Sequence, residues 1–132
     1  MGIFDIFKEA TKRYISESTH EDNMEVQLAK TPQILEELYK TGVTEKSELK
    51  LEYLFYTNAE DNAKRLMDSL KNIGYTPEHR LAPDSETTWL VTGLSHPVKM
   101  TKDKTYQWIG DMCILGFKED CQFDGWTAKT GE

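Results

Sequence analysis

The side chains that could carry acid–base or metal chemistry are scattered along this chain. His20, His79 and His96 fall in three different segments, and no spacing among them suggests that they share a metal ion. Solvated or hydrogen-bonded structural histidines are the favoured interpretation. Adjacent acidic residues, most simply solvated helix faces and helix ends, occur at Glu36-Glu37, Glu60-Asp61 and Glu119-Asp120. The residues therefore predict no catalytic base, no metal and no cofactor.

The two cysteines, Cys113 and Cys121, add little to this chemistry. Cys113 falls on the apolar face of an expected helix, which favours a small buried hydrophobic residue over a nucleophile. Two cysteines are too few for a disulfide framework and fit a reducing compartment. The N-terminus lacks the features of a signal peptide, and no apolar run has the length of a membrane span. We therefore expect a cytoplasmic protein that is neither an enzyme nor bound to a membrane.

One motif stands out near the C-terminus, Phe123-Asp124-Gly125-Trp126. A glycine inside a terminal strand marks a bulge or a close backbone approach. The aspartate can accept hydrogen bonds from nearby backbone amides, and the tryptophan can cover an open end of the core. Residue chemistry alone favours a structural lock at the strand end. A contact with a partner through Asp124, Gly125 and Trp126 is the functional alternative.

The scaffold for these residues is organised around a strand predicted over residues 49–57. Leu49, Leu51, Tyr53 and Phe55 recur at every second position, the period at which side chains share one face of a sheet. Leu54 and Tyr56 belong to the opposite face; if that face is exposed, it suggests a homodimer. The elements expected next are a helix over 58–74 capped by Asn58, strands over 75–81 and 87–94, a helix over 101–116 and a strand over 121–127.

This order, strand–helix–strand–strand–helix–strand, predicts an α+β fold of the ferredoxin-like βαββαβ type with an antiparallel sheet. Pro77 lies within the second strand and cannot donate a hydrogen bond to a neighbour, so that strand is expected at an edge of the sheet. In the ferredoxin-like arrangement the second strand does occupy an edge. The position of the proline and the topology therefore agree.

The first part of the chain is predicted to form an extension to this domain. Residues 3–17 carry an apolar stripe at mostly helical spacing, and residues 16–23 are predicted to be a polar linker. Thr31-Pro32 predicts a helix start, with the threonine as cap and the proline at the first helical position, and Gly42 predicts the end of that helix. The expected division is an N-terminal helical and linker region over 1–30 and a ferredoxin-fold domain over 31–132.

Charge argues against direct binding of nucleic acid. The chain carries 16 Lys and Arg against 23 Asp and Glu, a formal net charge of −7, and this sign repels a phosphate backbone. RNA-recognition modules share the predicted fold, but they need basic and aromatic residues on the third strand. That strand, Thr-Trp-Leu-Val-Thr-Gly-Leu, has no basic residue. RNA binding is therefore a weak alternative, and a basic protein partner is the more natural expectation.

The C-terminal motif also resembles one in a known family. Phe-Asp-Gly-Trp, following a helix that ends in Gly-Phe-Lys-Glu-Asp, is similar to the last strand of the regulator of ribonuclease activity B (RraB) family. The similarity extends back over roughly residues 31–128, through Trp-Leu-Val-Thr, Leu-Lys-Asn-Ile-Gly-Tyr and Leu-Glu-Glu-Leu-Tyr-Lys-Thr-Gly. Only Asp-Gly-Trp is distinctive, and residues 1–30 are not explained by it.

This resemblance implies a non-catalytic protein that binds the endoribonuclease RNase E and inhibits RNA cleavage by protein–protein contact. It offers contact residues only around Asp124, Gly125 and Trp126. Two alternatives stay open on the same fold. One is an immunity-type or other interaction protein with a different partner, and the other is a small ligand-binding module or enzyme on a dimeric ferredoxin-like fold.

Overall fold

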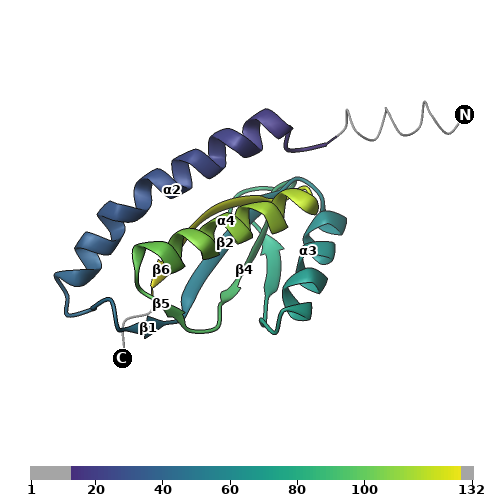
Figure 1. Ribbon diagram of the computed structural model, residues 1–132. Helices are drawn as coiled ribbons and strands as arrows, with labels where there is room; N and C mark the ends of the chain where they lie inside the picture. The colour runs from purple at the N-terminus through teal and green to yellow at the C-terminus, as the bar shows by residue number, and fades with distance from the viewer. Residues whose placement is uncertain (1–12, 129–132) are drawn as a thin grey trace, which may run out of the picture.

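The computed structural model describes residues 13–128, which form a four-stranded antiparallel sheet, a two-stranded ribbon and three helices (Figure 1). The sheet contains β2 (Leu51–Thr57), β3 (Glu78–Leu81), β4 (Trp89–Leu94) and β6 (Gln122–Ala128). The helices are α2 (Glu17–Tyr39), α3 (Glu60–Asn72) and α4 (Lys102–Lys118). Most of the helix predicted over 3–17 lies outside the described residues, and residues 13–16 are not helical.

The alternation around β2 confirms the predicted central strand. Leu51, Tyr53, Phe55 and Thr57 are all fully buried, while the residues between them are partly or wholly exposed. The buried set faces α3 and α4 and forms the core with side chains such as Leu66 of α3 and Ile109 of α4. We call the opposite side of the sheet the open face, because α3 and α4 both pack on the side of the buried set.

The strand order is β3-β4-β2-β6, with every neighbouring pair antiparallel. This is the ferredoxin-like order, in which the first strand lies between the third and the fourth. β3 occupies an edge, as Pro77 requires, and the proline itself comes immediately before the strand. A ribbon of β1 (Glu48–Leu49) and β5 (Val98–Lys99), which the sequence did not predict, lies beside the sheet.

The largest difference from the sequence prediction is helix α2. The predicted linker over 16–23 and the helix start at Thr31-Pro32 are both wrong, because one continuous helix begins at Glu17 and passes through Pro32. Ser16 is the true cap, and its Oγ accepts a hydrogen bond of 3.0 Å from the amide of Thr19. The predicted domain boundary after residue 30 therefore falls inside a helix.

Tertiary packing explains why α2 tolerates an interior proline. Proline cannot donate to the carbonyl one turn earlier, a loss of roughly 3 kcal/mol in an isolated helix. Met24 and Leu28, on the N-terminal side of Pro32, pack against the same core as Leu35 on its C-terminal side. The hydroxyl of Thr31 also donates a 3.0 Å hydrogen bond to the carbonyl of Gln27. Burial along the whole helix outweighs the local loss.

α2 also protects the edge of the sheet formed by β6. The side-chain amide of Asn23 donates a 2.8 Å hydrogen bond to the carbonyl of Phe123, and Gln27 lies behind it with only 4% of its surface exposed. These amides occupy the place that a further strand would take, which blocks edge-to-edge pairing. A smaller correction concerns α3, whose cap is Ala59 rather than the predicted Asn58, with no side-chain hydrogen bond.

Two tyrosines in the core differ in how their hydroxyls are satisfied. The Tyr53 hydroxyl is buried without a hydrogen-bond partner among the described residues, and a Cβ added at Gly93 would overlap it. The Tyr75 hydroxyl accepts a 3.1 Å hydrogen bond from the indole nitrogen of Trp108. The two rings are stacked, with centroids 5.8 Å apart.

We predict opposite effects for the same change at these two positions. Tyr53→Phe removes a buried hydroxyl without a partner and is expected to raise the free energy of unfolding by about 1 kcal/mol. Tyr75→Phe leaves the Trp108 indole without its acceptor and is expected to lower it by a similar amount. Urea unfolding followed by tryptophan fluorescence measures both. Equal destabilisation by the two variants would contradict the assignment of a hydroxyl without a partner.

Candidate functional site: a groove at the Asp-Gly-Trp bulge

The Asp-Gly-Trp motif forms a β-bulge in β6, one of the two features that the glycine predicted. The register changes between Leu54 and Phe55, which pair with Gly125 and Phe123, so Asp124 is the extra residue in β6. Gly125 has a φ of +128°, a conformation that side chains with a Cβ rarely adopt. A regular strand would direct Phe123 and Trp126 to opposite faces, because they are three positions apart. The bulge directs both toward the helices.

Trp126 is consequently part of the core. It is 9% exposed and meets the ring of Trp108 edge to face, with centroids 6.3 Å apart. It pairs in register with the fully buried Tyr53. Its position agrees with the structural interpretation of the motif, in which the tryptophan covers one end of the core.

Asp124 lies on the open face, where its carboxylate accepts a hydrogen bond from the hydroxyl of Tyr56. The charge of Asp124, followed by burial and by this hydrogen bond, raises the pKa of Tyr56. A smaller contribution comes from Tyr14. The phenol is therefore the proton donor in this pair.

A groove of about 480 Å³ lies between α2 and the open face. Its apolar surface comes from Ile34 of α2, Leu54 of β2 and Leu90 of β4, and Asp124, Gly125 and Trp126 all contribute to its wall. The structure thus brings the three predicted site residues together at one groove. Gln27 also lines it, next to the open space above Gly125.

Two cations flank the groove. Lys30 extends from α2 and Arg80 from β3, both exposed, and neither forms an ion pair with another described residue. Glu52, at one end of the groove, accepts a 3.3 Å hydrogen bond from the hydroxyl of Thr127. The groove therefore combines an apolar floor with two cations, Lys30 and Arg80, and two carboxylates, Glu52 and Asp124.

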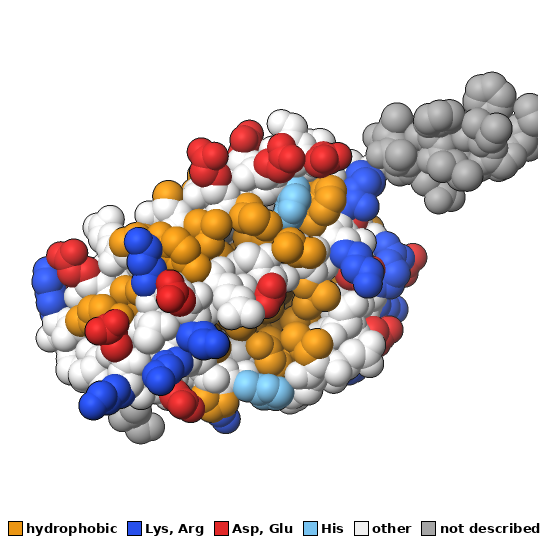
Figure 2. Space-filling model, in the orientation of Figure 1, with side chains coloured by type: hydrophobic (Ala, Val, Ile, Leu, Met, Phe, Trp, Pro, Cys, Tyr) orange, Lys and Arg blue, Asp and Glu red, His pale blue; other side chains and the backbone are white. Residues whose placement is uncertain are grey.

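Sequence reasoning missed Lys30, Ile34, Arg80 and Leu90 as parts of this site. The strand period combined with the register could have found two of them, because Arg80, Leu90 and Tyr56 form one row across the open face. Lys30 and Ile34 carried no such signal. Their place at the groove depends on the path of α2, which begins earlier than the sequence predicted. Acidic side chains gather instead on the outer surface of α2 (Figure 2), which carries Glu17, Glu21, Asp22 and Glu25.

The remaining titratable candidates have structural partners. His79 and Glu60 lie 3.1 Å apart, His96 lies 3.0 Å from the carbonyl of Gly74, and His20 stacks on Phe117. Burial raises the pKa of the Cys113 thiol to about 12. Burial is also the main cause that raises the pKa of the Cys121 thiol to about 12, so neither cysteine is a thiolate at neutral pH. Within residues 13–128 there is no cluster of three or more histidine, cysteine or acidic residues that could hold a metal ion.

Two comparisons with known proteins bear on this site. Residues 28–127 match the family model described as Regulator of ribonuclease activity B. The matched region contains all the groove-lining residues from Lys30 to Thr127. Gln27, which also lines the groove, lies just before the matched region. No curated protein sequence matches the chain. In the part of the chain that the structure describes, no helix is long and apolar enough to span a bilayer.

The bulge generates a prediction about stability. Gly125→Ala forces a residue with a Cβ into the positive-φ conformation and is expected to lower the free energy of unfolding by about 1–3 kcal/mol. The space around Gly125 is open, with Gln27 Oε1 at 3.8 Å from an added Cβ, so the cost is backbone strain. Gly110→Ala is the matched control in an uncrowded site of α4, where alanine should stabilise the helix. Both are measured by chemical unfolding, and equal effects would contradict the role of the bulge.

A second prediction concerns Trp126. Trp126→Ala removes a buried indole from the end of the core and is expected to lower the free energy of unfolding by about 3–5 kcal/mol. A thermal melt measures the loss. Unchanged stability together with lost partner binding would instead make the indole a contact residue.

Proposed function

We propose that this chain, which belongs to the regulator of ribonuclease activity B (RraB) family, contacts RNase E through the groove at the Asp-Gly-Trp bulge. Members of the family are non-catalytic regulators that inhibit RNase E by binding it. The observation that carries the proposal is the family match over residues 28–127, which spans nearly all of the described domain. RNase E acts in the cytoplasm, and the proposal therefore places this protein there.

The geometry supports the groove as the contact surface in two ways. First, the groove floor is only partly covered. Leu90 is nearly buried, at 6% exposed, but Leu54 beside it stays partly exposed, so a partner can complete the burial of Leu54. Second, Asp124 on the wall interacts with Tyr56 of the open face and raises its pKa. An apolar groove with polar groups at its rim is the arrangement found at the energetic centres of protein interfaces.

The test combines binding and inhibition. Wild-type protein should bind purified RNase E in a calorimeter and slow its cleavage of a fluorogenic RNA. Leu54→Glu places a charge on the groove floor and is expected to weaken binding at least about tenfold, the usual loss at an interface hot spot. Ile114→Glu is the matched control, because Ile114 is a 56% exposed hydrophobic residue on α4 away from the groove.

The outcomes separate the parts of the proposal. Equal affinity of both variants, with thermal melts that show folded protein, would place the contact elsewhere on the domain. Absence of binding by the wild-type chain would remove RNase E as the partner and favour an interaction protein with a different target. A homodimer through the open face stays a prediction, and light scattering on the same samples measures it.

A further inference from the structure

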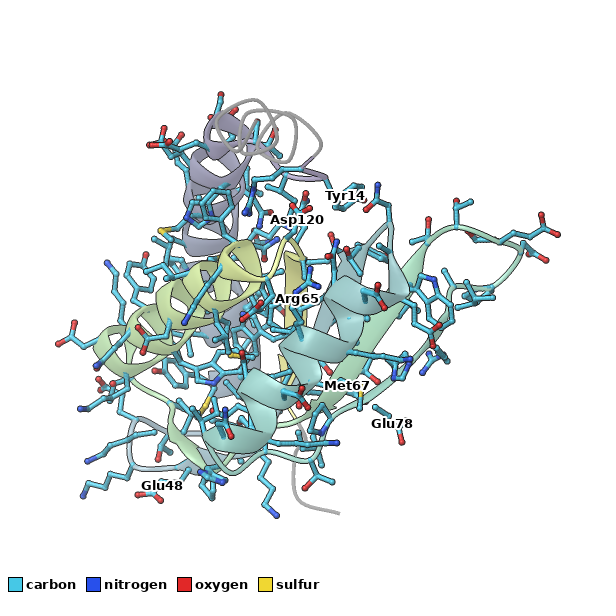
Figure 3. The ribbon with its side chains drawn as sticks, turned by 90° about the vertical axis from the view of Figure 1, so that its right-hand side faces the viewer. Tyr14, Glu48, Arg65, Met67, Glu78 and Asp120 are labelled. Atoms are coloured by element: carbon cyan, nitrogen blue, oxygen red, sulfur yellow. The ribbon has the colours of Figure 1, made fainter. Side chains whose placement is uncertain are left out.

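The four-stranded sheet has one edge that the described chain leaves uncovered. β6 forms one edge, and Asn23 of α2 occupies the place of a further strand there. β3 forms the other edge, and no described strand pairs with its outer side. Figure 3 shows the side chain of Glu78 in β3 projecting from the margin of the molecule, away from α2. An uncovered edge is where a further strand can be added to a sheet.

The ladder between β3 and β4 shows which main-chain groups of β3 face outward. Just beyond the strand, the amide of Ala82 donates a 2.8 Å hydrogen bond to the carbonyl of Thr88, in the register of the ladder. Hydrogen-bonded pairs alternate along an antiparallel ladder, so the main chain of Arg80, two positions back, also faces β4. His79 and Leu81, on either side of it, therefore direct their N–H and C=O groups away from the sheet.

The side chains of β3 on the open face carry opposite charges. Glu78 and Arg80 share that face, since they pair with Thr92 and Leu90 of β4. Both are exposed, and neither forms an ion pair with another described residue. Charged residues on a short edge strand usually oppose pairing with another strand. An acid and a base two positions apart are self-complementary, however, because an antiparallel copy of the strand presents them in the reverse order.

One register of two such strands satisfies both the main chain and the charges. When His79 of one copy stands opposite His79 of the other, their outward N–H and C=O groups meet as a hydrogen-bonded pair. Glu78 of each copy then stands directly opposite Arg80 of the other. Leu81, a 40% exposed hydrophobic residue, stands opposite Pro77, which has no N–H to leave unpaired.

The neighbouring registers are less favourable. A shift by one residue sets outward main-chain groups against inward ones, which cannot bond. A shift by two residues restores the main-chain match. It places two copies of Arg80 face to face in one direction and two copies of Glu78 in the other, and like charges directly opposite each other are destabilising.

We propose that a second copy of the chain pairs with the outer edge of β3 in this register and joins the two sheets into one. Such a contact is isologous, with a two-fold axis perpendicular to the sheet, so both open faces lie on the same side of the dimer. Each groove stays uncovered and gains Glu78 of the second copy beside its own Arg80. The dimer does not rest on the proposed function, and its test needs no ribonuclease.

The first experiment is sedimentation equilibrium of the full chain over a wide range of concentrations. The contact is small, so the wild-type dimer is expected only at high concentration. Glu78→Arg and Arg80→Glu each set like charges opposite each other and should weaken the dimer at least about tenfold. The variant that carries both changes should recover the wild-type dissociation constant. Glu25→Arg is the matched control, because Glu25 is an exposed acid on α2 at the opposite edge of the sheet.

A second experiment tests the register by oxidising a mixture of the Glu78→Cys and Arg80→Cys chains. The added thiols stand in a non-hydrogen-bonded pair, whose Cα atoms lie about 4.5 Å apart, within the range of about 4.4–6.8 Å that disulfides require. The mixed dimer also keeps one contact between Glu78 and Arg80. Cys113 and Cys121 are 2% and 1% exposed, so mild oxidation acts on the added thiols. We expect a covalent dimer from the mixture and much less from either chain alone.

Four results would overturn the proposal. The first is a wild-type chain that sediments as a monomer at every concentration. The second is a doubly changed variant as weak as Glu78→Arg or Arg80→Glu alone, because the two charges would then not face each other. The third is a covalent dimer that forms as readily from one cysteine variant as from the mixture. The fourth is a dimer weakened by Leu54→Glu and unaffected by Glu78→Arg, which would assign the contact to the open face.

Discussion

The extra residue in β6 is the constraint on which both faces of this protein depend. With Asp124 inserted and Gly125 at positive φ, Phe123 and Trp126 can both enter the core although they are three positions apart. The same insertion leaves Asp124 on the open face, bonded to Tyr56. In a regular strand, Phe123 and Trp126 would point to opposite faces, so the indole and Phe123 could not both enter the core. One local change of register therefore places the indole in the core and the carboxylate at the proposed contact surface.

A second junction, the turn at Asp120, joins the N-terminal part of the chain to this sheet. Asp120 has a φ of +59° and ends α4, with the amide of Cys121 donating a 2.8 Å hydrogen bond to the carbonyl of Gly116. Its carboxylate accepts the amides of Tyr14 and Ile15, and its carbonyl accepts the hydroxyl of Thr57. One residue thus fixes the start of the described chain, the end of α4 and the end of β2.

The division of labour between the two faces of the sheet fits a regulator that acts by contact. The face toward α3 and α4 carries the apolar burial that stabilises the fold, with Phe55, Leu66 and Ile109 fully enclosed. The open face buries fewer apolar groups and carries a groove lined by two cations, Lys30 and Arg80, and two carboxylates, Glu52 and Asp124. Such a surface can be reached by a partner without disturbing the core.

Local patterns in the sequence were sufficient for the order of the four strands of the sheet and the two helices packed on it. The alternation of Leu51, Tyr53 and Phe55 identified the central strand, Pro77 identified an edge, and Gly125 identified the bulge. Each is a property of one residue or of a short period, and here the tertiary packing agrees with it. Family membership followed from the same stretches, and the match over residues 28–127 confirms it.

The path of α2 and the groove were decided only by tertiary structure. Thr31-Pro32 has the local chemistry of a helix start, yet packing of Met24 and Leu28 on the core continues the helix past it. Periodicity says which face a side chain belongs to, but it does not say which distant side chain lies opposite. Lys30 and Arg80 flank one groove because a helix and an edge strand 50 residues apart in sequence border the same sheet face. That proximity is a property of packing, which no local pattern contains.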